Sequence, residues 1–307
     1  MLLILNNLLP IFAIISLGVI LKRFEWINES FISSSDRLIY YIFFPGLLFW
    51  KIGKPTEGLG IESGLILGVL GSVFAIFLIS LVFSRLFDLT DYEVGSFSQG
   101  CYRFSSYIGM ALTFSALGED GGRTFGILIG FVIPFINVLA VTSMTYYSAR
   151  ISSDRSGIRL IMKAMISNPL ILACIAGILY SRLSVGFPVF VENTFALMSS
   201  VTLPLALVSI GGTLTFAGYR KYLRKGLLSA SLKLLVLPVI GYVTMSALGV
   251  SESAMKVAMI YFALPTSPQN YILSSQLNSD VELATSSILV STILSIMSLS
   301  AVLIIFD

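Results

Sequence analysis

Residues 98–109 read SQGCYRFSSYIG, and residues 262–271 read FALPTSPQNY. Each stretch interrupts, with polar residues, Gly or Pro, a longer apolar segment that is otherwise suited to cross a bilayer. Irregular backbone at membrane depth is tolerated only where it is buried in protein or lines a wet cavity. Two such interruptions at corresponding places in a chain predict a membrane protein whose central site is built from broken helices.

The composition also indicates that a lipid bilayer surrounds this chain. It is 56% hydrophobic and 11% charged over 307 residues, whereas a soluble domain carries about 25% charged residues. The net charge of +3 is too small to indicate nucleic-acid binding. There is no His, which removes the commonest general base and metal ligand. Cys101 and Cys174 lie in apolar runs and are predicted to be small buried side chains, not a disulfide or metal pair.

Ten segments are long and apolar enough to be membrane spans, which need about 20 residues each. The fourth and ninth are the weakest, because they contain the two quoted stretches. The apolar N-terminus lacks a basic leader and is expected to be a retained first span. In the third span, Gly64, Gly68 and Gly71 are predicted to lie at close helix contacts. The ten spans are 2–21, 33–50, 63–84, 95–117, 124–147, 161–181, 194–217, 227–248, 254–277 and 284–306.

Five positions recur at an offset of 159 residues, close to half of the chain. A single offset that explains all five pairs predicts two related halves of five spans each, residues 1–147 and 161–307, joined by a hydrophilic linker at 148–160. The recurring pairs are Pro10 and Pro169, Gly18 and Gly177, Arg23 and Arg182, Pro45 and Pro204, and Gly53 and Gly212.

The placement of Lys and Arg predicts the orientation. If the N-terminus lies outside, 13 of these residues fall in inner loops and 5 on the outer side, a bias typical of cytoplasmic loops. Both termini are therefore predicted outside, and since five is odd, the second half is inverted. The inner group is Lys22, Arg23, Arg37, Arg85, Arg150, Arg155, Arg159, Lys163, Arg220, Lys221, Arg224, Lys225 and Lys233; the outer group is Lys51, Lys54, Arg123, Arg182 and Lys256.

The two interrupted spans are the expected binding site. At an offset of 160 residues Ser106 falls on Thr266, so the interruptions occupy equivalent places in the halves. Pro265 and Pro268 lack N–H donors and free carbonyls upstream. Freed carbonyls, half-helix N-termini and short hydroxyls can hold a small ligand. The alternative is a kink that serves packing alone.

Arg103 is the one cation predicted in the middle of a span. It can bind an anionic substrate, form an internal ion pair or carbonyl cap, or reach the inner interface. Asn137, in the fifth span, can bond a neighbouring helix or face the cavity. Because no Asp or Glu lies deep in a span and His is absent, a side-chain proton relay is not expected. A sodium site made of carbonyls and hydroxyls stays open.

Three segments resemble the auxin efflux carrier family, the PIN-like permeases. Residues 102–112 (YRFSSYIGMAL) resemble the family's Phe-Arg-x-Asn-x-Tyr-Ile-Gly-x-Ala-Leu stretch, which continues to Pro134 and Asn137. Residues 264–273, on to Asp280, resemble its second crossover, and prolines of the second and seventh spans also match. The family usually has Asn where this chain has Ser105. A hydroxyl is shorter and offers fewer donors, so the substrate geometry is expected to differ there.

The resemblance implies ten helices in two inverted five-helix repeats, related to the bile acid–sodium symporter fold. It implies a scaffold of spans 1, 2, 6 and 7, usually dimeric. It also implies a transport domain of spans 3–5 and 8–10 that moves like an elevator, with the broken spans 4 and 9 crossing at the site. Family members carry small organic anions, such as auxins or dicarboxylates like malonate and malate.

Taken together, these features predict an all-α polytopic permease for a small organic anion, and not an enzyme. The resemblance implies a prokaryotic plasma membrane. The alternative is a non-transporting membrane sensor with the same fold. No cofactor, metal or nucleic acid is expected, and the expected partners are the substrate, lipid and a second copy of the chain. The residues expected to bind substrate are Arg103, Ser105, Ser106 and Tyr107 from one crossover, Pro265, Thr266, Gln269 and Asn270 from the other, and Asn137 from the side.

Overall fold

The computed structural model describes residues 8–54, 62–151, 169–183, 185–214 and 219–306. All regular secondary structure within these ranges is helical, which confirms the predicted all-α class. Five helical stretches are long and apolar enough to cross a membrane. They are Ser63–Leu86, Asp91–Tyr147, Val189–Thr213, Lys221–Ala247 and Val281–Ile305. The count of ten spans and the inverted repeat stay predictions.

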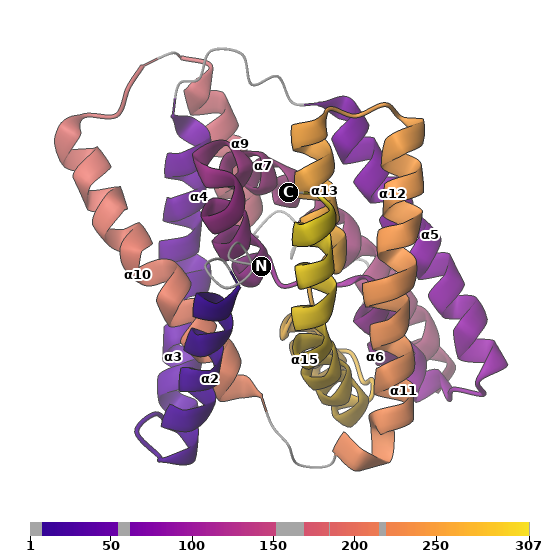
Figure 1. Ribbon diagram of the computed structural model, residues 1–307. Helices are drawn as coiled ribbons and strands as arrows, with labels where there is room; N and C mark the ends of the chain where they lie inside the picture. Colours follow the sequence, from indigo (N-terminus) through magenta and orange to yellow (C-terminus); the bar gives the residue numbers. More distant parts are fainter. Residues whose placement is uncertain (1–7, 55–61, 152–168, 184, 215–218, 307) are drawn as a thin grey trace. The chain divides into compact units, whose positions relative to one another are not determined.

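The chain forms two compact units (Figure 1), and each is described by itself. Unit 1 comprises residues 1–62, 107–131 and 165–213. Within it α2 packs along α10, and α4 packs along α9. Its helices are α2 (Leu9–Arg23), α3 (Glu29–Leu38), the π-helix η1 (Ile39–Phe43), α4 (Phe44–Gly53), α9 (Pro169–Ser181), α10 (Val189–Thr213) and the 107–131 part of α7 (Ser106–Ile151).

Glycines of the repeat bring the helices of unit 1 into close contact. A Cβ on Gly18 of α2 would lie 2.2 Å from the carbonyl oxygen of Val208 in α10. A Cβ on Gly177 of α9 would lie 3.2 Å from the carbonyl oxygen of Phe49 in α4. Gly177 follows Gly18 by 159 residues, and Val208 follows Phe49 by the same 159. Such reciprocal contacts are what a two-fold relation between two similar helix pairs produces.

Unit 2 comprises residues 63–106, 132–164 and 214–307. Within it α5 packs against α6 and α12, α11 against α15, and α13 against α12 and α15. Its helices are α5 (Ser63–Leu86), α6 (Asp91–Tyr102), the later part of α7, α11 (Tyr219–Ser231), the π-helix η2 (Leu232–Val236), α12 (Leu237–Ala247), α13 (Glu252–Ala263), α14 (Gln269–Gln276) and α15 (Val281–Ile305).

A proline follows each π-helix after one intervening residue. Helix η1 ends at Phe43 and is followed by Pro45, and η2 ends at Val236 and is followed by Pro238. A proline has no N–H to donate to the preceding turn, and its ring crowds the carbonyl four residues earlier. The wider π turn accommodates that misfit without ending the helix. Thus residues 29–53 and 219–247 each continue as one helical stretch through a proline.

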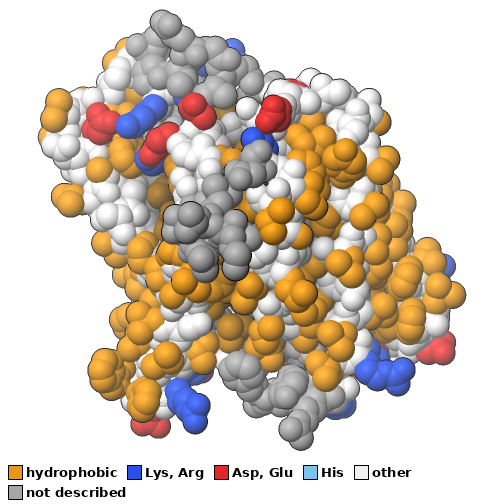
Figure 2. Space-filling model, in the orientation of Figure 1, with side chains coloured by type: hydrophobic (Ala, Val, Ile, Leu, Met, Phe, Trp, Pro, Cys, Tyr) orange, Lys and Arg blue, Asp and Glu red, His pale blue; other side chains and the backbone are white. Residues whose placement is uncertain are grey.

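The surface agrees with a lipid environment. On the face shown in Figure 2, hydrophobic side chains cover much of the length of the helices, and charged side chains gather near helix ends. Leu67 on α5 is 64% exposed and Leu197 on α10 is 73% exposed. Cys101 and Cys174 are free and buried, as predicted.

The structure corrects several sequence-based expectations. Lys233, counted among the inner-loop cations, lies inside η2 and is fully buried. The predicted spans 95–117 and 124–147 meet in α7 at a sharp kink between two helices at Gly118, whose φ of 67° suits a residue without a Cβ. Helix α7 also extends to Ile151, so the first residues of the predicted linker 148–160 are helical, and the rest lies outside the described residues.

Among the glycines of α5, only some lie at close contacts. A Cβ on Gly68 would lie 2.6 Å from the Met245 side chain, as the sequence predicts. A Cβ on Gly71 would meet nothing within 4 Å, so the prediction of a close contact at Gly71 is wrong.

We expect Gly211→Val to destabilise the protein, because a Cβ there would lie 2.0 Å from the carbonyl oxygen of Ile15 and would force α10 away from α2. Overpacking of this kind costs about 1–3 kcal/mol. The measurement is the thermal midpoint of the purified protein in detergent. The control is Gly71→Ala, which has open space and should change stability by less than about 1 kcal/mol. Equal midpoints for the two variants would contradict the tight α2–α10 contact.

Candidate functional site

Helices α6 and α13 form matched first halves of the two interrupted spans. Each is 12 residues long and begins after a hydroxyl N-cap, Thr90 or Ser251. Each ends at an extended residue, Arg103 with φ −64° and ψ 151°, and Leu264 with φ −66° and ψ 147°. These helix ends are 161 residues apart, not 160 as the sequence alignment of Ser106 with Thr266 assumed. By the helix ends, Thr266 is the counterpart of Ser105.

The two breaks hydrogen-bond to each other inside unit 2. The Ser105 N–H donates to the Pro265 carbonyl at 2.9 Å. The Thr266 hydroxyl donates to the Gly100 carbonyl at 2.8 Å, and the Thr266 N–H donates to Ser291 Oγ at 3.1 Å. Backbone groups released by the helix breaks thus find partners, as burial in an apolar medium requires.

Arg103 lies at the centre of this crossing and is 1% exposed. Its Nη1 donates to Gln269 Oε1 at 2.9 Å, and its Nη2 donates to Asn137 Oδ1 at 2.7 Å. Both amide side chains are half-buried. The guanidinium is therefore held inside unit 2, and the interpretation that it reaches the membrane interface does not hold. Asn137 is half-buried and bonds Arg103 at the end of another helix, which is one of its two predicted roles.

The Ser105 hydroxyl differs in its hydrogen bonding from the hydroxyl of Thr266, its counterpart in the second break. Ser105 is 2% exposed, and its Oγ has no hydrogen-bond partner within the part of the chain that the structure describes. Thr266 in the other break uses its hydroxyl on the Gly100 carbonyl. A buried hydroxyl without a partner carries a desolvation penalty that a ligand can remove. Ser105 is thus the polar group of the crossing best placed to accept a further partner.

Asn270 is buried and uses both ends of its amide within the protein. Its Nδ2 donates to the Ser96 carbonyl at 3.1 Å, and its Oδ1 accepts from Ser274 Oγ at 3.3 Å. Ser96 Oγ in turn donates to Ser274 and Ser279. Sequence analysis missed these serines, although small hydroxyls at helical spacing in apolar spans are a usual signal of interhelical bonding.

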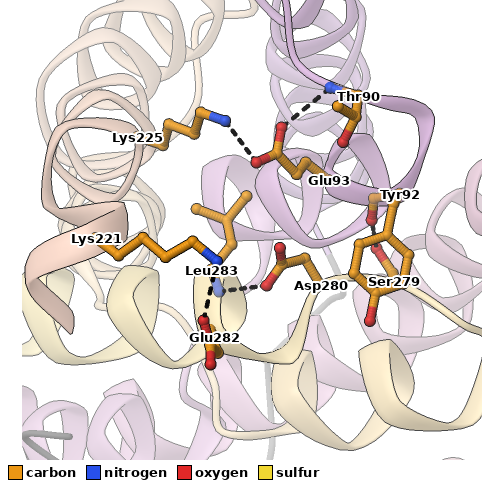
Figure 3. Close-up of polar contacts among 9 residues, drawn as sticks. All are labelled: Thr90, Tyr92, Glu93, Lys221, Lys225, Ser279, Asp280, Glu282 and Leu283. Atoms are coloured by element: carbon orange, nitrogen blue, oxygen red, sulfur yellow. Dashed lines mark hydrogen bonds and ion pairs between the residues drawn. The ribbon is translucent and has the colours of Figure 1, made fainter. Parts of the chain in front are cut away.

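An ionic cluster joins the starts of α6 and α15 at one end of unit 2 (Figure 3). Lys225 Nζ contacts Glu93 at 2.5 Å, and Glu93 also accepts from the Thr90 N–H as part of a capping box. The Asp280 carboxylate accepts from the Leu283 N–H at 2.9 Å and caps α15. The Tyr92 carbonyl accepts from the Asp280 N–H and from Ser279 Oγ. These caps fix the first turns of the two helices.

The remaining predicted site residues are divided between the units. Ser106 is the first residue of α7 and is half-buried, and Pro268 precedes α14. Tyr107 belongs to unit 1, where its ring meets Phe44 edge-on at a centroid distance of 4.8 Å. The other residues predicted to bind substrate belong to unit 2: Arg103, Ser105, Ser106, Asn137, Pro265, Thr266, Gln269 and Asn270.

A buried cation and polar broken helices, in a chain of apolar helices, define an integral membrane protein of the transporter class. Comparisons with known proteins agree. Residues 153–303 match the family model described as "Membrane transport protein". This match confirms the resemblance to the auxin efflux carriers and the assignment as a transporter and not an enzyme.

The relatives span nearly the full chain. A protein of Rhizobium meliloti named "Putative malonate transporter" is 23% identical over 304 residues, covering 96% of this chain and 93% of its own length. An "Uncharacterized transporter" of Methanothermobacter thermautotrophicus is 23% identical over 298 residues, covering 96% of this chain and 95% of its own. Another, from Methanocaldococcus jannaschii, is 22% identical over 299 residues, covering 94% of each chain.

We expect Asn270→Ala to lower the stability of the protein by about 1–3 kcal/mol, because it leaves a buried carbonyl at Ser96 without its donor. The measurement is the thermal midpoint in detergent. Ser275→Ala, on an exposed position of the same helix, is the control and should change the midpoint little. An unchanged midpoint for Asn270→Ala would show that this amide does not hold α14 to α6.

Proposed function

We propose that this chain is a secondary transporter for a small organic carboxylate. The observation that carries the proposal is the buried Arg103 guanidinium, held by the half-buried amides of Gln269 and Asn137, beside the unpartnered Ser105 hydroxyl. A planar guanidinium with fixed donors suits a carboxylate. The name of the Rhizobium meliloti relative points to a small dicarboxylate and makes malonate a suitable first test substrate.

Substrate binding follows from exchange of partners at Arg103. The two amide oxygens now bonded to Nη1 and Nη2 occupy positions that a carboxylate can take. Gln269 and Asn137 then offer their NH₂ groups to the same ligand. Ser105 Oγ adds a donor, and the N-terminus of α14, which starts at Gln269, favours negative charge. In this proposal Asn270 and Thr266 hold the crossing in shape, and Pro265 presents its carbonyl to Ser105.

Transport in this proposal is by alternating access of the elevator type. Unit 2 contains eight of the nine predicted site residues and is the proposed carrier of the substrate. The helices α2, α3, α4, α9 and α10 of unit 1 are the proposed scaffold, through which two copies of the chain associate. The family relationship supports both assignments and a prokaryotic plasma membrane, and the charge bias supports both termini outside.

We expect Arg103→Gln to reduce malonate counterflow in proteoliposomes by at least about tenfold. Hydrogen bonds to a charged group contribute about 1.5–3 kcal/mol each, and about 1.4 kcal/mol corresponds to a factor of ten. Arg103→Lys should fall between this variant and the wild type, because it keeps the charge and loses the paired donors. The measurement is the uptake of labelled malonate into vesicles preloaded with unlabelled malonate.

The control for Arg103 is Lys256→Gln, which removes a cation from the i,i+4 pair with Glu252 and should leave counterflow unchanged. Wild-type counterflow retained in Arg103→Gln would exclude Arg103 from the substrate site. Malonate binding to the wild-type protein without any flux would favour the alternative, a membrane sensor with this fold.

We expect Ser105→Ala to weaken malonate binding by about tenfold, since a hydrogen bond to a charged ligand contributes about 1.5–3 kcal/mol. The same variant should unfold at the wild-type temperature without ligand, because the hydroxyl has no hydrogen-bond partner in the described structure. Malonate-dependent shifts of the thermal midpoint measure both quantities. A large loss of intrinsic stability would instead assign Ser105 a structural role.

A further inference from the structure

Lys233 is a buried cation that takes no part in the proposed substrate site. It lies in η2, and its side chain is 0% exposed. Its Nζ has no hydrogen-bond partner among the described residues. The Nζ lies over the face of the Tyr261 ring, 5.4 Å from the ring centroid. An ammonium has three donors, and none of them is satisfied here.

The surroundings of Lys233 contain no carboxylate in the part of the chain that the structure describes. Cys101 on α6 is near enough to interact with it electrostatically, and Tyr261 comes from α13. The other helices packed against η2 are α5, α11, α12 and α15. Those of their ionisable side chains that the structure describes lie at helix ends, on exposed faces or in the cluster of Figure 3: Arg85, Lys221, Tyr222, Arg224, Lys225, Tyr242 and Glu282.

Lys233 is nevertheless linked to both breaks of the crossing. The Tyr261 ring that it faces packs edge-on against Phe104, with ring centroids 4.5 Å apart. Phe104 lies in the first break, between Arg103 and Ser105, and Tyr261 is in the last turn of α13 before the second break. Any movement of the breaks that accompanies substrate binding therefore changes the environment of Lys233.

The charge of Lys233 must depend on that environment. A sealed, unpaired ammonium is far more costly than an uncharged amine, which loses only hydrogen bonds. Opening of the crossing to water, or arrival of an anion nearby, favours the ammonium instead. We propose that Lys233 is the proton-binding site of this transporter and that a proton moves together with the anion. The inference rests on the proposed transport of a carboxylate.

The step is a simple proton transfer. The nitrogen lone pair of Lys233 takes a proton from water on the side to which the site is open. The resulting ammonium is stabilised by the bound anion, so proton and anion each favour the binding of the other. Release of the anion on the opposite side removes that stabilisation, and the amine returns its proton to water there. Arg103 cannot fill this role, because a guanidinium stays protonated.

The test uses the wild-type protein in proteoliposomes that contain a trapped pH-sensitive dye, with the membrane potential clamped. Malonate is added outside at a pH where it is fully ionised, so that the substrate itself carries no proton. The expected result is acidification of the vesicle lumen in proportion to malonate uptake, abolished by a protonophore. Malonate uptake without acidification would overturn the inference and leave the proposed function standing. Absence of any malonate uptake would overturn both.

Two variants test whether Lys233 binds the transported proton. Lys233→Met is expected to fold, because replacement of a buried charge by an apolar side chain of similar length is often neutral or stabilising. It should lose the acidification that accompanies each malonate taken up. Lys233→Arg, permanently charged, should retain counterflow and lose proton movement. The control Lys221→Met, at an exposed cation, should keep the wild-type ratio. A wild-type ratio of protons to malonate in either Lys233 variant would overturn the assignment.

Discussion

The rest of unit 2 depends on one constraint: two broken helices must satisfy their backbone groups without water. An unpaired N–H or C=O in an apolar medium costs several kcal/mol. Here each break supplies partners to the other. The Ser105 N–H uses the Pro265 carbonyl, and the Thr266 hydroxyl uses the Gly100 carbonyl. Neither break would be stable alone, so the two interruptions must occur together.

This mutual dependence explains the many buried hydroxyls around the crossing. Ser291 of α15 accepts from the Thr266 N–H, and Ser96 and Ser279 bond each other across α6 and the start of α15. Hydroxyls are short and can both donate and accept, so they serve irregular backbone at little cost in space. Once these bonds are assigned, the hydroxyl of Ser105 stands out as buried and unpartnered. It lies two residues after Arg103 in the first break.

Much of this could be predicted from the sequence, because length and apolarity decide which segments enter a bilayer, and Pro or clustered polar residues decide where they break. Arg103 was identifiable for the same reason, since polar residues surround it. Lys233 was not. Its neighbours Leu232 and Leu234 are apolar, and a charge count assigns any lysine near a span end to a loop. Only the packing of α5, α6, α13 and α15 around η2 shows that its side chain is fully buried.

The positive φ at Gly118 and the absence of a close neighbour at Gly71 were not predicted, for a related reason. The chain has 25 glycines, and composition does not show which of them adopts a positive φ or meets a neighbouring backbone. Gly118 adopts a positive φ, and Gly18 meets the backbone of Val208. The contact at Gly18 joins segments far apart in the sequence, which periodicity within one segment cannot encode.

Residues related by the internal repeat make equivalent contacts in unit 1 and differ in unit 2. The difference lies at the proposed substrate site. In unit 1, Gly18 meets Val208 and Gly177 meets Phe49, so equivalent residues make equivalent contacts. In unit 2, α6 and α13 have the same length and the same ending, yet the residues after them diverge: Arg103 against Leu264, and the unpartnered Ser105 against the bonded Thr266. Repeated packing requires only that shape be kept. The proposed anion site needs a cation as well, and of the two breaks only the first supplies one, Arg103.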